Sequence, residues 1–238
     1  MVTILKWTKG VNQRRSGDAP AVWRVRIPPG GAVAAPLTSR HARAATAGTV
    51  ADVTRIVAGS LGGRRLEVPP GDRTRPTSDR VREALFNTLA TLVNLAGARF
   101  ADLYAGSGAV GLEALSRGAS HVLLVEHHPR AVRAARANVA ALAARARVRV
   151  ITSAVTAALA QGTDQPYDVV FADPPYDLPC EQVAALQQAL VDGGWLAPDA
   201  ILVIERPTRA PALRWVTPVT GIRVRRYGET TLWYGRRS

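Results

Sequence analysis

Short apolar segments alternate with alanine-rich segments through most of the chain beyond residue 97. The apolar segments predict strands, and they lie at Phe100–Tyr104, His121–Glu126, Val148–Thr152, Val169–Ala172 and Ile201–Glu205. The alanine-rich stretches between them have the composition of helices. Strands that take turns with helices form βαβ units, in which the strands run parallel. The pattern therefore predicts an α/β fold with a doubly wound, mostly parallel sheet.

The C-terminal end of the chain departs from this alternation. Arg223–Gly228 and Thr230–Gly235 follow each other as two strand-like segments with a tight turn between them and no helix. Strands joined by so short a turn pair antiparallel. We therefore expect an antiparallel hairpin at the C-terminal edge of the sheet.

The segment before the sheet predicts a small N-terminal extension made of a hairpin and a helix. Arg55–Gly59 and Arg64–Val68 resemble two short strands connected through a pair of glycines. Beyond them, apolar residues at helical spacing predict a helix from about Asp79 to Leu92. Ser78 or Thr77 offers this helix an N-cap.

The charge of the chain points to a polyanionic partner. Its 238 residues contain 31 Lys and Arg and 18 Asp and Glu, for a formal net charge of +13 and a pI of about 11.3. Lys6 and Lys9 are the only lysines, so nearly all the positive charge is guanidinium, which suits phosphates and the faces of bases. An excess of this size indicates nucleic acid. A general bias of the composition toward Arg and Ala is the alternative explanation.

Residues 1–53 differ from the rest of the chain in composition. They are rich in Pro, Gly, Ala, Ser and Arg without sustained periodicity, which predicts a disordered basic extension. Three explanations stay open: a basic tail that engages RNA, an arginine-rich leader similar to a transit peptide, and a start codon assigned too far upstream. We favour the last, with initiation near Val53.

Cysteine content and hydropathy limit the compartment and the kind of site. Cys180 is the only cysteine, so the chain can form neither an intrachain disulfide nor a multi-cysteine metal site. His127 and His128 have no further ligand at metal-binding spacing, and we expect no metal. No stretch approaches the roughly 20 apolar residues that span a bilayer. We expect a cytoplasmic protein that has no membrane partner.

A glycine-rich motif follows the first predicted strand of the sheet. Asp102–Gly111 reads D-L-Y-A-G-S-G-A-V-G and contains the spacing Gly106-x-Gly108-x-x-Gly111. A turn of this kind lets backbone N–H groups approach a ligand beyond the carboxyl ends of the strands. Glu126 ends the next strand, 20 residues after Gly106, where a carboxylate can accept hydrogen bonds from both ribose hydroxyls. By themselves these residues also describe a nicotinamide site.

A second motif, Asp173-Pro174-Pro175-Tyr176, follows the fourth strand of the sheet. Proline has no backbone N–H to donate, and two prolines in succession form a stiff, extended turn. The carbonyl groups of this turn point outward. The Asp173 carboxylate and the Pro174 carbonyl can accept both N–H bonds of an exocyclic amine, which turns the nitrogen lone pair toward an electrophile. Tyr176 can stack on an extruded base. The tetrapeptide therefore predicts an amine-binding catalytic site.

Together, the two motifs and their order resemble the class I, Rossmann-like methyltransferases that use S-adenosylmethionine to methylate amines. The resemblance implies S-adenosylmethionine as cofactor and assigns the catalytic residues to the tetrapeptide. It assigns cofactor binding to Asp102, Tyr104, Gly106, Ser107, Gly108, Gly111, Glu126, Ser153 and Ala154. A dehydrogenase is disfavoured, because Asp102 lies where a dinucleotide fingerprint has an apolar residue and the tetrapeptide would have no role. Ser153 departs from the Asp or Asn that methyltransferases often place against adenine.

Several substrates fit such a tetrapeptide: adenine N6 or cytosine N4 in DNA, guanine N2 or adenine N6 in RNA, and glutamine in protein. Only 71 residues separate Asp102 from Asp173 and 62 follow Tyr176, which leaves no room for a DNA target-recognition domain. Protein glutamine methyltransferases normally have Asn in place of Asp173. A non-catalytic RNA-binding assembly factor is a further alternative, disfavoured by the intact cofactor motif.

The region before the sheet favours one of these substrates. Residues 73–87, with Arg55–Gly59 and Gly63–Leu66, closely resemble the N-terminal region of the bacterial RsmD family, and the resemblance covers residues 54–238. It implies methylation of guanine N2 at one site of 16S ribosomal RNA in an assembled or assembling 30S subunit. We also expect a monomer. The chain then divides into the extension at 1–53, an RNA-facing hairpin and helix at 54–96, and a catalytic domain at 97–238.

Arginines cluster in the segment that resembles the RsmD family. Those at the predicted helix start are placed where the helix dipole and guanidinium groups both favour phosphate. We predict RNA contacts from Arg55, Arg64, Arg65, Arg73, Arg75, Arg80 and Arg82. For any one of them, a solvated basic surface is the alternative.

Overall fold

A computed structural model describes residues 54–69 and 78–238. They belong to one unit of the chain, Gly48–Ser238. The extension predicted at residues 1–53 lies outside the described residues, as do Arg73, Arg75 and Thr77.

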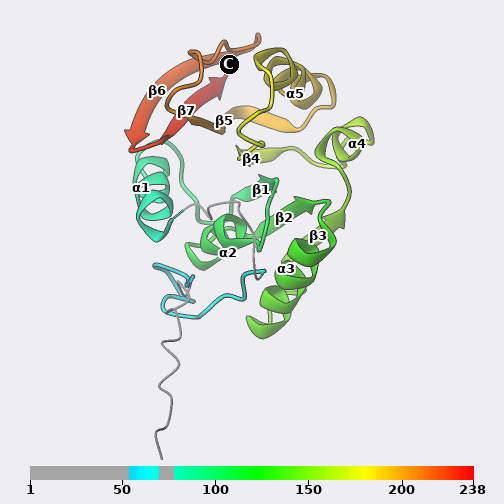
Figure 1. Ribbon diagram of the computed structural model, residues 1–238. Helices are drawn as coiled ribbons and strands as arrows, with labels where there is room; N and C mark the ends of the chain where they lie inside the picture. The colour runs from blue at the N-terminus through cyan, green and yellow to red at the C-terminus, as the bar shows by residue number, and fades with distance from the viewer. Residues whose placement is uncertain (1–53, 70–77) are drawn as a thin grey trace, which may run out of the picture. The chain divides into compact units, whose positions relative to one another are not determined.

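The sheet contains both the parallel and the antiparallel strands expected from the pattern (Figure 1). Its strands are β1 (Arg99–Leu103), β2 (His121–Glu126), β3 (Val148–Thr152), β4 (Tyr167–Ala172), β5 (Leu196–Pro207), β6 (Val219–Tyr227) and β7 (Thr230–Arg237). Their order across the sheet is β3-β2-β1-β4-β5-β7-β6. The first five pair in parallel, whereas β7 runs antiparallel to both β5 and β6. The predicted fold class is therefore confirmed.

Helices cover both faces of this sheet. They are α1 (Asp79–Leu89), α2 (Ala109–Ser116), α3 (Pro129–Ala141), α4 (Val155–Ala160) and α5 (Cys180–Asp192). The longest helices in the described part of the chain have 13 residues, and none there is long and apolar enough to cross a membrane.

Two apolar layers hold the helices to the sheet. One layer joins α1, α2 and α3 to side chains such as Phe100 and Leu124, and the other joins α4 and α5 to the opposite-facing Leu103 and Val125. Figure 1 shows the two groups of helices on opposite sides of the strands. Strands β1, β2 and β4 are buried on both faces, which explains why they read as nearly continuous apolar runs.

Several predicted boundaries change in the structure. Helix α1 begins after the Ser78 cap, whose Oγ accepts a hydrogen bond from the Val81 N–H at 3.3 Å, but it ends at Leu89 rather than Leu92. The Thr91 Oγ1 donates to the Thr88 carbonyl at 2.8 Å within a terminal turn. Strand β5 begins before the predicted Ile201, because its backbone follows β4 from that strand's first residue.

The predicted N-terminal hairpin is short: Arg55 and Arg65 form an antiparallel bridge, and the Leu66 N–H donates to the Thr54 carbonyl at 2.8 Å. Beyond it, the backbone N–H groups of Val57 and Ala58 donate to the two carboxylate oxygens of Glu113, at 2.7 and 3.0 Å. Because a side chain from α2 takes these donors, the segment also docks on that helix. The predicted hairpin is therefore confirmed, although its pairing is shorter than the two predicted strands.

Helix α2 is almost completely enclosed by this docking. Its residues from Val110 to Ser116 are all buried, including the charged Glu113. The Ser116 hydroxyl accepts a hydrogen bond from the Leu61 N–H at 2.9 Å and donates to the Ala58 carbonyl. Buried polar groups are stable only with such partners, so Glu113 and Ser116 fix how the N-terminal segment lies on the sheet domain.

Arg82 belongs to this buried cluster, and the prediction that it contacts RNA is wrong. Its side chain is fully buried, with Nη2 at 2.9 Å from Asp79 and Nε at 3.6 Å from Glu113. It also donates to the Arg55 carbonyl. The helical period places position 82 against α2 rather than on the exposed side of α1, so its guanidinium is inaccessible to a macromolecule.

We predict that Glu113→Ala lowers the free energy of unfolding by about 3–5 kcal/mol, because it removes one of the two carboxylates that pair with the buried Arg82 and leaves two backbone donors without their acceptor. Urea unfolding followed by circular dichroism measures the change. Glu83→Ala, on the exposed side of α1, is the control and should change the free energy by less than about 0.5 kcal/mol. Equal effects of the two substitutions would show that Glu113 is not a structural centre.

Candidate active site

The five parallel strands end together at one edge of the sheet. The register pairs Leu103 of β1 with Val125 of β2 and with Ala172 of β4, and pairs Ala172 with Ile204 of β5. The next residue along each of these strands therefore lies at the same edge. In an open α/β sheet a ligand binds at this edge, where the strand order reverses. Here the reversal is at β1, between β2 and β4.

The glycine motif forms the turn between β1 and α2. Tyr104, Gly106 and Gly108 have positive φ angles of 63°, 55° and 81°, a conformation that costs little only for glycine. A Cβ built on Gly106 would meet no atom within 4 Å, whereas one on Gly111 would lie 2.4 Å from a Leu124 methyl carbon. Gly106 thus borders open space and Gly111 permits close packing of α2 on the sheet.

Asp102 stabilises this turn from inside the first strand. Its Oδ2 accepts a hydrogen bond from the Gly111 N–H at 2.8 Å, and the side chain is buried. Burial raises the pKa of Asp102 to about 7, the Gly111 hydrogen bond lowers it, and the charge of Glu126 raises it further. Asp102, the acid that is not expected in a dinucleotide fingerprint, therefore holds α2 to β1.

Glu126 lies directly beside the glycine turn. Its Oε2 accepts from the Gly106 N–H at 2.9 Å, and its Oε1 accepts from the N–H groups of His127 and His128 at 2.7 Å each. A carboxylate has about four acceptor sites, so the three backbone bonds leave capacity for a ligand hydroxyl. Ser153 joins the same edge, since its N–H donates to the Glu126 carbonyl at 3.0 Å.

Ser153, which was predicted to contact adenine, lies close to Glu126 and the glycine turn. Ser153 follows β3, and its hydroxyl donates to the carbonyl of Ala154 at 3.1 Å. Ala154 is the exposed N-cap residue of α4. The structure therefore brings Ser153 and Ala154 to the same strand edge as the glycine turn, and an adenine contact by Ser153 stays a prediction.

The tetrapeptide lies on the other side of β1 from Glu126. The Asp173 N–H donates to the Leu103 carbonyl at 3.4 Å, which ties the start of the tetrapeptide to the end of the strand that carries the glycine turn. Pro174 is buried and Pro175 is exposed. The following turn is held by buried Arg206, whose Nη2 donates to the Leu178 carbonyl at 2.9 Å. Two motifs 71 residues apart in the sequence thus meet in space.

Burial raises the pKa of Asp173 well above its ordinary value, and the negative charges of Glu205 and Asp102 raise it further. The site is therefore a series of carboxyl groups along one strand edge: Glu126, Asp102, Asp173 and Glu205. Such crowding favours a cationic ligand, because a positive charge would stabilise the ionised forms.

A pocket of about 440 Å³ opens beside the tetrapeptide. Residues from the tetrapeptide, α1, β5 and the β6–β7 hairpin line it: Ser78, Arg80, Val81, Tyr176, Glu205, Arg226, Tyr227, Gly228, Glu229 and Thr230. Tyr176 is 41% exposed, and its Oη lies 3.4 Å from the Thr230 Oγ1. The pocket is large enough to receive a planar base beside Tyr176.

Sequence reasoning assigned only Arg80 and Tyr176 to this pocket, and the residues that it missed include Glu205, Thr230 and Arg226. For Glu205 a signal was present, because it ends a predicted strand as Glu126 does. Thr230 and Arg226 could not be found in this way, since they enter the site through the antiparallel pairing of β7 with β5 and β6.

The predicted arginine cluster is divided in the structure. Arg80 lines the pocket, and the side chain of Arg55 is exposed, 3.8 Å from Asp79. Arg65 is also exposed. Arg64 instead donates to the carbonyl of Ala141, the last residue of α3, at 2.9 Å. Because α3 starts at the strand edge and runs away from it, Arg64 lies at the far end of that helix and not beside the pocket.

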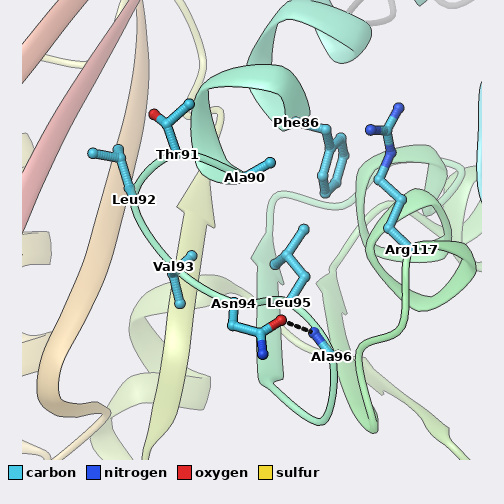
Figure 2. Close-up of a pocket in the computed structure, with 9 residues that line it drawn as sticks. All are labelled: Phe86, Ala90, Thr91, Leu92, Val93, Asn94, Leu95, Ala96 and Arg117. Carbon is cyan, nitrogen blue, oxygen red and sulfur yellow. Dashed lines mark hydrogen bonds between the residues drawn. The ribbon is translucent and has the colours of Figure 1, made fainter. Parts of the chain in front are cut away.

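A second pocket, of about 610 Å³, lies away from this edge (Figure 2). It is formed by the segment that leads from α1 into the start of β1, together with Phe86 and Arg117. The Arg117 guanidinium lies 4.9 Å from the centre of the Phe86 ring. The Asn94 side chain accepts from the Ala96 N–H at 3.0 Å. No carboxylate is among its lining residues, whereas Glu205 and Glu229 line the smaller pocket.

Comparisons with known proteins find a matching family and several similar proteins. The family model described as conserved hypothetical protein 95 matches residues 54–236. Ribosomal RNA small subunit methyltransferase D of Escherichia coli (strain K12) is 43% identical over 154 residues, 63% of this chain and 73% of that protein. Its Haemophilus influenzae namesake is 36% identical over 162 residues, 67% of this chain and 81% of that protein.

One solved structure is similar to this chain in both sequence and fold. The structure of yhhF from Escherichia coli superposes with a TM-score of 0.70 at 33% sequence identity, and covers 78% of this chain and 98% of that one. The similarity therefore extends to the arrangement of the elements that form the strand edge.

We predict that Asp102 makes the free energy of unfolding depend on pH. Its folded pKa of about 7 lies above its ordinary value of 3.8, so between these values the folded state keeps a proton that the unfolded state releases. This stabilisation is complete below about pH 4 and is lost as the pH rises to about 7. Asp102→Asn keeps an acceptor for the Gly111 N–H and should lack this dependence.

Urea unfolding of both proteins between about pH 4 and pH 8 tests this expectation. The stability of the variant relative to the wild type should increase up to about pH 7 and stay constant above it. Parallel curves over the whole range would mean that Asp102 titrates at its ordinary pKa.

Proposed function

The chain belongs to the RsmD family, whose model is described as conserved hypothetical protein 95, and on that premise we propose that it is an S-adenosylmethionine-dependent methyltransferase of ribosomal RNA. More narrowly, we propose that it methylates N2 of one guanine in 16S RNA within an assembled or assembling 30S subunit. The observation that carries this proposal is the meeting of the glycine turn and Asp173–Tyr176 at one strand edge, beside a pocket walled by Tyr176.

The glycine turn and its neighbours fit the proposed methyl donor. Gly106 borders open space, Glu126 retains acceptor capacity for ribose hydroxyls, and Ser153 lies at the adjoining strand end. When bound there, S-adenosylmethionine supplies an electrophilic methyl group on a positively charged sulfur. The carboxyl groups of Asp102, Glu126 and Asp173 surround this place with negative charge, which favours a sulfonium over a neutral ligand.

Asp173 and Pro174 are positioned to hold the target amine. In our proposal the Asp173 carboxylate and the Pro174 carbonyl accept the two N–H bonds of the amine, so that the nitrogen lone pair faces the methyl group. The amine becomes positively charged as the C–N bond forms, and Asp173 stabilises that charge. Burial, and then the charges of Glu205 and Asp102, raise the pKa of Asp173, whereas the adjacent cationic donor favours its ionised form. In this proposal, the positioning of the amine against the methyl group provides most of the rate enhancement.

Tyr176 and the pocket are suited to an extruded base. The exposed Tyr176 ring offers a stacking surface next to Asp173, and enzymes that modify bases commonly place them against an aromatic side chain. Arg80 and Arg226 line the same pocket. Guanidinium groups at the entrance of a base pocket can hold the phosphates on either side of an extruded nucleotide. This arrangement supports an RNA substrate.

Transfer of radiolabelled methyl from S-adenosylmethionine to 30S subunits that lack the modification tests the proposed function. Nucleoside analysis should detect labelled N2-methylguanosine in 16S RNA, and mapping then identifies the nucleotide. Cofactor binding measured by calorimetry, combined with no label in RNA, would overturn the RNA substrate and point to an amine in DNA or protein.

We predict that Asp173→Ala lowers kcat by about 100-fold or more, because it removes the group that orients the amine and stabilises its charge. Calorimetry should show that S-adenosylmethionine still binds. Asp177→Ala, an exposed acid four residues further on, serves as the control with normal kcat. Loss of cofactor binding together with activity in Asp173→Ala would indicate a structural role for Asp173.

We predict that Arg226→Ala raises the KM for 30S subunits and reduces the slope of log binding constant against log salt concentration by about 1, as expected for loss of one phosphate contact. The control is Arg145→Ala, an exposed arginine in the segment before β3, at the opposite end of the sheet. An unchanged salt slope in Arg226→Ala would exclude a phosphate contact by this residue.

A further inference from the structure

Glu205 is a buried carboxylate in the pocket that the proposed methyl transfer does not use. It lies near the end of β5 and is 2% exposed. Together with Tyr176 and Thr230 it lines the pocket of about 440 Å³. A carboxylate at the wall of a ligand pocket can accept a hydrogen bond from a bound base.

The fold places Glu205 next to Asp173. Ala172 of β4 pairs with Ile204 of β5, and Asp173 and Glu205 are the next residues of these parallel strands. The charge of Glu205 is also the larger of the two that raise the pKa of Asp173. Two carboxyl groups therefore lie at neighbouring strand ends: Glu205 lines the pocket, and Asp173 begins the tetrapeptide whose Tyr176 lines it.

Thr230 fixes the orientation of the second carboxyl group. Its Oγ1 donates to the Glu205 Oε1 at 3.3 Å and lies 3.4 Å from the Tyr176 Oη. Thr230 is buried and starts β7, which is paired with β5. The carboxylate is thus held on a rigid strand, linked through Thr230 to the tyrosine proposed to stack on the base.

Two adjacent acceptors match one base better than the others. Guanine carries an N1–H donor beside its exocyclic N2 amine, whereas adenine and cytosine have an acceptor nitrogen beside theirs. If Asp173 holds the amine, an adjacent carboxylate meets an N–H in guanine but a lone pair in adenine or cytosine. A buried polar group left facing a lone pair disfavours the wrong base strongly.

The geometry points to Glu205 as the residue that selects guanine, by accepting a hydrogen bond from N1–H while Asp173 holds the N2 amine. This inference rests on the proposed function and adds the base specificity of the pocket to it. Glu205 is a specificity-determining residue here: it touches the base but not the transferred methyl group.

The test compares guanine with 2-aminopurine, a base that keeps the amine at C2 but has an acceptor at N1. After the target position has been mapped, 30S subunits are reconstituted with 16S RNA that carries either base there. Glu205→Gln has the same shape, but its amide can donate a hydrogen bond to N1 of 2-aminopurine. Glu181→Gln, an exposed acid on α5, is the matched control. Calorimetry with S-adenosylmethionine and circular dichroism confirm that each variant is folded.

The wild type should prefer guanine to 2-aminopurine by about 100-fold or more in kcat/KM, as expected for a site built to bind a donor. Glu205→Gln should lose most of its activity on guanine and gain on 2-aminopurine, so that the preference shrinks or reverses. Glu181→Gln should keep the wild-type preference.

Two results would overturn the role of Glu205 while leaving the proposed function intact. One is equal activity of the wild type on both bases, which does not depend on how the variant folds. The other is a Glu205→Gln variant that loses activity on both bases in the same proportion. Absence of wild-type transfer to guanine would instead overturn the proposed function itself.

Discussion

A parallel sheet places the carboxyl ends of its strands at one edge, and the candidate site depends on this constraint. Glu126, Asp173 and Glu205 come from three different strands, yet the register from β2 to β5 brings them to the same edge. Asp102 lies one residue inside the same edge and interacts electrostatically with both Glu126 and Asp173. No local sequence feature produces this arrangement, because each acid ends a separate βαβ unit.

The acidic edge explains how a strongly basic chain can hold a cationic methyl donor. The formal charge of +13 favours association with a polyanion over long distances. Within the site acidic side chains gather instead, and burial raises the pKa of Asp102 and of Asp173. In the proposed reaction the two charge patterns have separate roles: arginines such as Arg80 and Arg226 attract the RNA, and the carboxyl groups stabilise the sulfonium and the amine.

The N-terminal segment is attached to the sheet domain by buried polar groups as well as by apolar side chains such as Ile56 and Leu66. Glu113 accepts two backbone N–H groups from this segment and pairs with Arg82 and Arg117. Asn138 of α3 makes a further link, since its side chain bonds to the backbone of Glu67 and donates to the Ser107 carbonyl of the glycine turn. The segment before the sheet is therefore connected through one side chain to the proposed cofactor turn.

The sequence by itself determined the fold class and the two motifs, because apolar periodicity and glycine spacing are local properties of the chain. It also placed Asp102 inside the first strand, Gly106 in the turn that follows, and Glu126 and Asp173 at strand ends, as the structure has them. Only the tertiary structure decided the roles of Arg82 and Glu205. Arg82 is an arginine with other arginines nearby, as expected of an RNA contact. Its position on α1 nevertheless faces α2, where its guanidinium forms a buried ion pair with Glu113. Glu205 enters the pocket because β5 pairs with β4 and β7, and long-range pairing of this kind has no signature in any short stretch of sequence.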